Sequence, residues 1–272
     1  MSGKGDQTGG GEVLPERTSS GFRRMFSRYV ERMMRRRFHA VRLLAGDERV
    51  LEEVDASRRP TIILISHASW WDPLLGLLLW RRCFPNRDIF LPMDESQLRR
   101  FAFFRRIGVF GIDPDDPRSL DAMRRHVLDR FSRSDSALLG LTPQGRFTDP
   151  REPVRLRPGA AAIAASLPEP PEVAVISVEY VFWQDARPEV LVSTVRVTPP
   201  EGTSTASWQR RFTDAMSAAR DRLATAAIGR RPEDFNVIVG AGAKINPFMD
   251  AWLRWRGQSG GIEARRNSEA AG

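Results

Sequence analysis

The sequence of 272 residues has little cysteine, little lysine and no long apolar run, and each shortage excludes a class of structure. Cys83 is the single cysteine, so the chain forms no internal disulfide and a reducing compartment is expected. No stretch reaches the roughly eighteen consecutive apolar residues that a membrane-spanning helix needs. The first residues lack the apolar segment of a secretory leader, so we expect the protein on the cytoplasmic side.

Basic charge, by contrast, is abundant and almost entirely arginine, since Lys4 and Lys244 are the only lysines. The formal net charge is +8 at pH 7. Such a surplus predicts a polyanionic partner, either nucleic acid or the anionic face of a membrane. The apolar fraction of 41% is ordinary for a globular chain, and the length is ample for a buried core.

The most informative stretch is Thr61–Leu79, which reads TIILISHASWWDPLLGLLL. Its short β-branched run, Ile62–Ile65, predicts a strand buried on both faces. Pro73 suits the first turn of a helix, with Asp72 before it as the N-cap. We therefore expect a strand, a tight turn and a helix. His67 then leaves the carboxyl end of the strand, where open α/β sheets place their ligands.

Four residues separate His67 from Asp72, so the turn can fold the carboxylate back onto the imidazole. An aspartate in that position fixes the tautomer of the ring and leaves the other ring nitrogen as a base. The same spacing also fits a helix-capping aspartate beside a structural histidine. An isolated pair of this kind does not decide between the two interpretations.

The rest of the chain alternates between strand and helix patterns. Strands are predicted at 88–93, 108–112, 136–142, 173–181 and 189–197, and helices at 95–106, 119–133, 160–166 and 208–227. This order predicts an α/β fold with a central, mostly parallel or mixed sheet flanked by helices, in a single domain over residues 20–256. The polar, glycine-rich residues 1–19 and 257–272 are expected to be disordered.

Residues 20–45 predict one basic amphipathic helix. The apolar stripe consists of Phe22, Met25, Phe26, Tyr29, Val30, Met33, Met34, Phe38 and Val41, and arginines surround it. Such a helix either lies in a membrane interface or packs on its own domain with a solvated basic face, and both remain open. The segment 246–256, with two tryptophans beside arginines, allows the same two interpretations.

Two further segments hold residues that are typical of ligand sites. The segment Asp113–Arg118 holds three aspartates, but its two prolines favour a turn and a helix cap over a metal site. After the strand at 136–142 comes Pro143-Gln144-Gly145-Arg146, in which the glycine admits close approach of a ligand and the arginine suits phosphate. The alternative is an ordinary Pro-x-Gly turn with a surface arginine.

Taken in order, these segments resemble the glycerolipid acyltransferases, the family that includes lysophosphatidic acid acyltransferases. His67 and Asp72 match the His-x4-Asp motif of that family, and Pro143–Arg146 is similar to its Pro-Glu-Gly-Thr/Ser-Arg block, with Gln144 in the place of the glutamate. The resemblance implies that His67 is a general base activating an acceptor hydroxyl for attack on an acyl thioester. It implies that Asp72 orients that base.

The resemblance also implies contacts with the acceptor or its phosphate, and neither a metal nor a cofactor. The implied contact residues are Gly145, Arg146, Arg118, Arg155 and Arg157. The donor is then acyl-CoA or acyl-ACP, and the acceptor a lysophospholipid or related lipid. We expect a peripheral protein on the cytoplasmic face of the cell membrane that does not bind nucleic acid. The alternative hypothesis is a non-catalytic basic protein that binds membrane or nucleic acid.

Overall fold

The computed structural model describes residues 12–183 and 185–240. Its helices are α1 Ser20–Arg37, α2 Glu48–Ala56, α3 Asp72–Cys83, α4 Glu95–Arg100, α5 Pro117–Arg133, α6 Gly159–Ala165 and α7 Thr205–Gly229, with the 3-10 turns η1 Ala102–Ile107 and η2 Pro232–Asp234. Its strands are β1 Ala40–Leu44, β2 Thr61–Ile65, β3 Asp88–Asp94, β4 Val109–Ile112, β5 Ala137–Leu141, β6 Glu172–Val181, β7 Glu189–Arg196 and β8 Phe235–Gly240. The predicted α/β class is confirmed.

The eight strands of the described residues form one mixed sheet with the order β4-β3-β5-β2-β6-β7-β1-β8. The pairs from β4 to β6 are parallel, β6 and β7 are antiparallel, β7 and β1 are parallel, and β1 and β8 are antiparallel. Strand β2 therefore lies inside the sheet, between β5 and β6. The carboxyl ends of the parallel strands meet at one edge, so the segments after β2, β4 and β5 are neighbours there.

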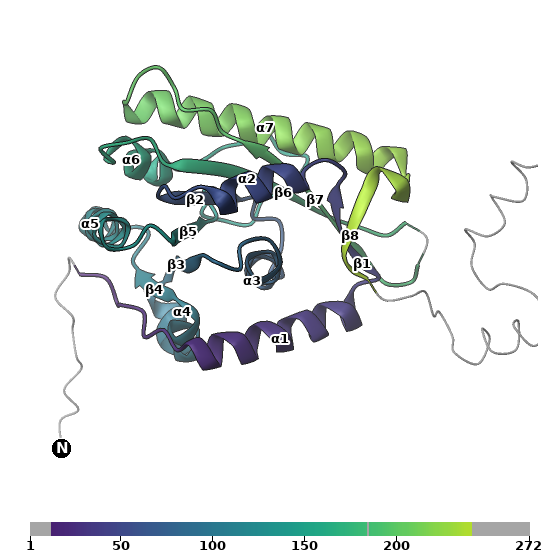
Figure 1. The fold of residues 1–272 in the computed structure, drawn as a ribbon, viewed down its shortest axis with the longest axis horizontal. Helices are drawn as coiled ribbons and strands as arrows, with labels where there is room; N and C mark the ends of the chain where they lie inside the picture. The colour runs from purple at the N-terminus through teal and green to yellow at the C-terminus, as the bar shows by residue number, and fades with distance from the viewer. Residues whose placement is uncertain (1–11, 184, 241–272) are drawn as a thin grey trace, which may run out of the picture.

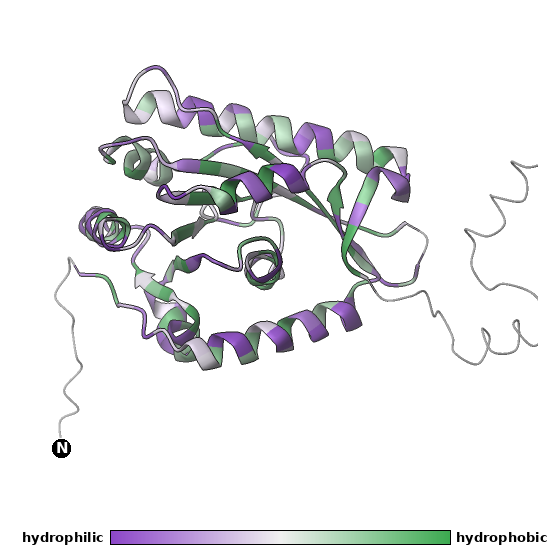
Figure 2. Ribbon diagram, viewed as in Figure 1, coloured by the Kyte–Doolittle hydropathy of each residue, from purple (hydrophilic) through white to green (hydrophobic). Residues whose placement is uncertain are grey.

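Helices cover both faces of this sheet, with α1 and α7 on opposite sides (Figure 1). On one face α1, α2 and α3 share a core that includes Val30 and Leu75. On the other face α5, α6 and α7 share a core that includes Val127 and Phe212. Apolar residues dominate the strands between these layers (Figure 2). Each fully buried side chain of this size stabilises the fold by about 1.5–3 kcal/mol.

The structure corrects the prediction of one helix over residues 20–45. Helix α1 ends at Arg37, and Ala40–Leu44 form β1 between β7 and β8. The stripe also divides: Val30 and Met34 are fully buried against the core, whereas Met25 is 59% and Tyr29 57% exposed. Packing on its own domain therefore accounts for the inner face of α1. The outer face of α1, which carries Met25 and Tyr29, is exposed and can contact a partner.

A second correction concerns the lead-in at 1–19, of which residues 12–19 are described. Leu14 exchanges two backbone hydrogen bonds with Gly111, at 3.0 and 2.7 Å, and so extends the sheet beside β4. Glu16 lies 3.1 Å from His126 on α5. These contacts fix residues 12–19 onto the domain. The segment 246–256 and the tail 257–272 lie outside the described residues.

Candidate active site

The site begins where β2 ends. The backbone N–H of Ser66 still donates to Ile176 of β6 at 2.9 Å, and the Ser66 hydroxyl accepts from the N–H of Val178 at 2.9 Å. These two bonds continue the attachment of β2 to β6 for one residue beyond the strand. The next residue, His67, is therefore presented at the carboxyl edge of the sheet on a fixed backbone.

His67 and Asp72 face each other across the turn that joins β2 to α3. Nδ1 of His67 lies 3.0 Å from Oδ2 of Asp72, which also accepts the Ser69 N–H at 2.7 Å. The Asp72 side chain is fully buried, whereas the His67 side chain is 18% exposed. Helix α3 begins at Asp72 with Trp71 as its N-cap, so the carboxylate serves the turn and the imidazole instead of capping the helix. With its proton on Nδ1, His67 leaves the Nε2 lone pair to accept a proton.

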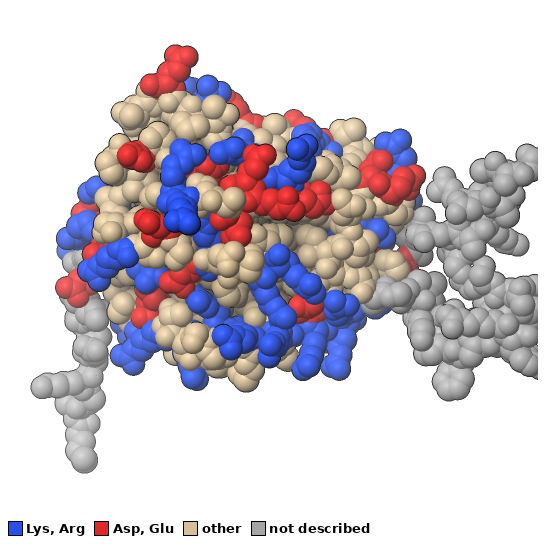
Figure 3. Space-filling model, viewed as in Figure 1, with Lys and Arg blue, Asp and Glu red and all other residues tan. Residues whose placement is uncertain are grey.

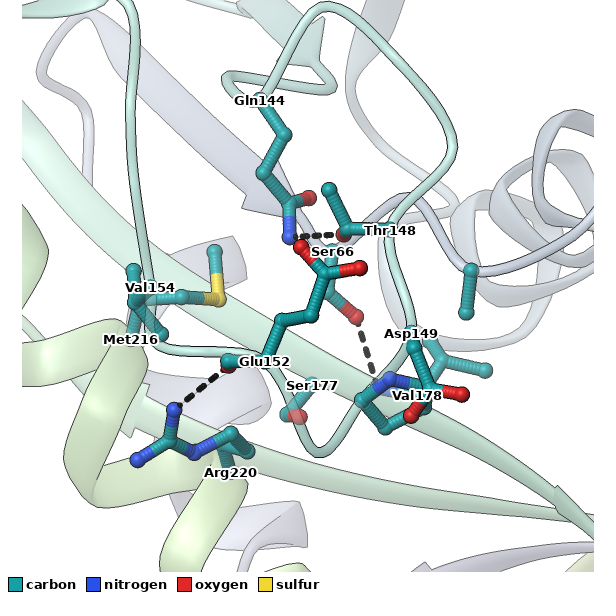
Figure 4. Close-up of a pocket in the computed structure, with 12 residues that line it drawn as sticks. Ser66, Gln144, Thr148, Asp149, Glu152, Val154, Ser177, Val178, Met216 and Arg220 are labelled. Carbon is teal, nitrogen blue, oxygen red and sulfur yellow. Dashed lines mark hydrogen bonds between the residues drawn. The ribbon is translucent and has the colours of Figure 1, made fainter.

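The loop after β5 is tied to the same turn through Gln144. Its side-chain oxygen accepts the backbone N–H of His67 at 2.6 Å. Its amide nitrogen donates to the hydroxyl of Thr148 at 2.6 Å, as Figure 4 shows. The Thr148 N–H in turn donates to the carbonyl of His67 at 2.8 Å. Because the first bond needs an acceptor and the second a donor, the amide fits both roles. Phe147 places its ring 4.4 Å from the imidazole and is 58% exposed.

Next to this loop lies a small pocket with a volume of about 310 Å³, open solvent included (Figure 4). Ser66, Gln144 and Thr148 line it on the side of the turn, and Met216 and Arg220 on the side of α7. Arg220 donates to the carbonyl of Glu152 at 2.9 Å and so connects α7 to the loop. His67 is not among the residues that line this pocket.

The structure brings together two of the five expected anion contacts, Gly145 and Arg157. Gly145 has φ +67, and a Cβ there would come within 2.7 Å of Arg157 Nε. The left-handed backbone conformation favours glycine at this position, and a side chain there would also displace the guanidinium of Arg157. Arg157 also donates to the carbonyl of Pro114 at 3.2 Å. It therefore joins the loop after β5 to the loop after β4.

The other three arginines lie in separate, exposed positions. Arg118, at the start of α5, is 73% exposed and pairs with Asp116 of its own turn at 3.5 Å. Arg146 is 66% exposed and lies 3.5 Å from Glu152. Arg155 is exposed on the segment before α6. The assignment of these arginines and of Gly145 to an acceptor phosphate remains a prediction.

Sequence reasoning missed Tyr180, which lies beside the pair. Its hydroxyl donates to Oδ1 of Asp72 at 2.6 Å. Burial and the neighbouring Asp72 charge strongly raise the pKa of the Tyr180 hydroxyl, so it stays protonated and acts as a donor. No local pattern marks Tyr180. It reaches the His67 turn because β6 pairs with β2 in the register Ile65 to Ile176 and extends beyond the end of β2.

Neither a metal site nor a membrane span is found in the described part of the chain. No group of three or more His, Cys, Asp or Glu side chains among residues 12–183 and 185–240 is arranged to hold a metal ion. No helix in these ranges is long and apolar enough to cross a membrane.

Comparison with known proteins identifies the class. The Acyltransferase family model matches residues 45–181, which is half of the chain and contains the whole His67 turn. The protein therefore belongs to the Acyltransferase family, which confirms the resemblance seen in the sequence, and it is an acyltransferase.

Comparisons with individual proteins add little to the family assignment. Among solved structures, the chain is similar to the 1-acyl-sn-glycerophosphate acyltransferase PlsC from Thermotoga maritima. The identity is 14%, the TM-score is 0.48, and the match covers 75% of this chain and 81% of that one. A likeness at that level carries no argument about the substrate. No curated protein matches the chain.

Proposed function

We propose that the protein transfers a fatty acyl group from an acyl thioester to a hydroxyl of a lysophospholipid or related lipid, with His67 as general base. This proposal rests on the pair of His67 and Asp72 at the edge of the sheet. The two side chains lie 3.0 Å apart, and the buried carboxylate orients the partly exposed imidazole. Acyl-CoA and acyl-ACP both fit as donors. A free alcohol is a poor nucleophile. A general base accelerates the attack because it removes the hydroxyl proton as the new bond forms.

In the proposed reaction His67 both takes up and returns the proton. Nε2 takes the hydroxyl proton of the acceptor as its oxygen bonds to the acyl carbon. The carbon–sulfur bond then breaks, and the proton returns to the departing thiolate. Asp72 holds the ring on the Nδ1 side and stabilises the transient imidazolium. The acceptor's phosphate, where it has one, would be held by Arg157 beside Gly145. Arg118 at the start of α5, and Arg146 and Arg155 on the segment after β5, would turn toward it from their exposed positions.

Release of free thiol tests this function directly. Wild-type protein is incubated with acyl-CoA or acyl-ACP and a panel of lysolipids with and without a phosphate, and the acylated product is identified by mass spectrometry. We expect thiol release that depends on the acceptor and falls in His67→Ala by roughly two to four orders of magnitude, the scale of a general base. Turnover in His67→Ala equal to that of wild type would exclude the proposed role.

We also propose that the protein acts at the cytoplasmic face of the membrane through the outer side of α1 and the adjoining η1. Met25, Tyr29, Phe101 and Phe103 are between 40% and 59% exposed. The Phe26 ring lies between two of them, 6.1 Å from Tyr29 and 5.6 Å from Phe103. We call these four exposed residues, with Arg24, Arg28, Arg32 and Arg36, the α1–η1 surface.

Charge supports a lipid partner for this surface. Lys and Arg side chains gather along the edge of the molecule where α1 lies (Figures 1 and 3). Aromatic and Met side chains enter the headgroup region while arginines reach lipid phosphates. Nucleic acid would use the same charge, but it offers no apolar layer for the exposed rings.

Vesicle flotation over a salt series tests the α1–η1 surface. We expect the double variant Tyr29→Ser, Phe103→Ser to bind anionic vesicles at least several-fold more weakly than wild type. The matched control is Ile228→Ser, which removes an exposed apolar side chain, 83% exposed, from α7 on the opposite side of the sheet. Equal binding by all three proteins would contradict the proposal, as would capture of duplex DNA in preference to vesicles.

A further inference from the structure

The two oxygens of the buried Asp72 carboxylate have different partners. Oδ2 serves the turn, since it accepts the Ser69 N–H and faces His67. Oδ1 accepts from the hydroxyl of Tyr180 on β6, 108 residues further along the chain, at 2.6 Å. The proposed chemistry at His67 uses only the first oxygen. The second oxygen and its donor are therefore unexplained by the His-x4-Asp motif itself.

We propose that Tyr180 is a positioning residue for acyl transfer, which acts through Asp72 by fixing the rotation of the carboxylate and with it the direction of the His67 ring. This inference rests on the proposed function of His67. It assigns to β6 a part in the site that neither the motif nor the loop after β5 supplies.

The geometry explains why one hydroxyl has this effect. A carboxylate bonded only through Oδ2 can swing about its Cβ–Cγ bond and exchange its oxygens. A second donor on Oδ1, arriving from a different strand, removes that freedom. Without the hydroxyl, Oδ1 becomes a buried charged acceptor with no hydrogen-bond donor among residues 12–183 and 185–240, an arrangement that proteins avoid by moving the group. Any rotation of Asp72 tilts the imidazole that it holds.

Tyr180 is itself held firmly enough for this purpose. Its backbone pairs with Val190 of β7, and its ring lies 5.9 Å from that of Phe38. Phe38 also contacts Trp71, the residue before Asp72, at 5.0 Å. Tyrosine, unlike a second acid or a histidine, stays a neutral donor over the working pH range in this buried place.

The variant Tyr180→Phe keeps the ring and removes only the hydroxyl. We expect kcat to fall about tenfold while KM for both substrates stays within about twofold, because the ground-state contacts are unchanged and only the aim of the base is lost. Tenfold is well below the roughly hundredfold that a 1 Å misplacement of a catalytic group can cost. Activities are compared at a temperature well below the Tm of each protein.

The chain offers a matched control for loss of a buried hydroxyl. Ser193 is fully buried and donates to Oδ2 of the buried Asp47 at 3.1 Å, far along the sheet between β7 and the start of α2. Ser193→Ala therefore repeats the same deletion on a structural aspartate. We expect it to lower Tm while leaving kcat unchanged. A general loss of rigidity in the sheet would instead lower kcat in both variants.

A double-mutant cycle with Asp72→Ala establishes whether Tyr180 acts through the acid. In the Asp72→Ala background we expect Tyr180→Phe to change kcat by less than twofold, since the group it positions is gone. A full tenfold loss in that background would overturn the proposal, as would wild-type kcat in Tyr180→Phe alone. Failure of the proposed function has a different signature, because wild-type protein would then show no thiol release that depends on His67.

Discussion

All three histidines of the chain face a carboxylate, yet only one of these pairs has the surroundings of a catalytic dyad. His67 is 3.0 Å from Asp72, His39 is 3.0 Å from Asp185, and His126 is 3.1 Å from Glu16. Distance therefore does not distinguish them.

The difference lies in what else the acid contacts. Asp185 also pairs with Arg187, and Glu16 with Arg130, so a permanent cation already balances each charge. Asp72 pairs with no arginine in the described part of the chain, and its other donors are the neutral Ser69 N–H and Tyr180 hydroxyl. A proton arriving on His67 is therefore the charge that compensates Asp72. This is the property that a base needs at the moment it takes up a proton.

The largest expected effect separates the three histidines by activity. His67→Ala is expected to lose two to four orders of magnitude in kcat. His39→Ala and His126→Ala are expected to keep kcat within about threefold and to lower the free energy of unfolding by about 1 kcal/mol each, the usual value of one polar contact. Thiol release and thermal melting measure the two effects. A loss of kcat in His39→Ala as large as that in His67→Ala would show that the comparison is wrong.

A smaller effect is expected from the acids. Asp72→Asn keeps the shape of the side chain but removes the charge that compensates the protonated ring, and its amide favours the wrong tautomer of His67. We expect kcat to fall roughly a hundredfold or more, with KM little changed. Asp185→Asn is the matched control, since it alters a buried acid beside another histidine, and it should lower Tm without lowering kcat. Full turnover in Asp72→Asn would reduce Asp72 to a structural residue of the turn.

These comparisons also show which parts of the molecule local sequence can predict. The strand β2, the turn and α3 follow from a β-branched run, a break and a proline, all within Thr61–Leu79. The end of α1 does not follow in this way, because the apolar spacing continues unbroken through Phe38 and Val41. The chain turns there since the His39 N–H donates to Pro188 at 2.9 Å and β1 pairs with β7, contacts from far along the sequence.

The site residues that the sequence did not predict were missed for the same reason. Tyr180 and Gln144 reach the turn only because β6 and β5 flank β2, so their roles depend on strand order and not on local pattern. The same holds for Glu16, which the composition of residues 1–19 placed in a disordered lead-in. Its ion pairs with α5 become visible only when the segment is seen beside β4.

The smallest expected effect concerns the pair of Glu16 and His126 and depends on pH. Burial raises the pKa of Glu16, but the close contact with His126 and the charges of His126 and Arg130 outweigh burial, so the pKa is lowered overall. A carboxyl with a depressed pKa in the folded state stabilises the fold above its unfolded pKa of about 4.3 and loses that contribution as the pH falls through the folded value.

Glu16→Gln should therefore lower Tm at pH 6 by about 2–4 °C, which corresponds to about 1 kcal/mol in a domain of this size. The difference from wild type should shrink below about pH 4.3 and vanish in stronger acid, where Glu16 is protonated in both states. Glu169→Gln, which changes an exposed loop carboxyl, is the control and should shift Tm little at any pH. A difference for Glu16→Gln that persists unchanged into acid would mean that the side chain acts by packing. The neighbouring Arg130 would then not be the only difference between the His126–Glu16 pair and the His67–Asp72 pair.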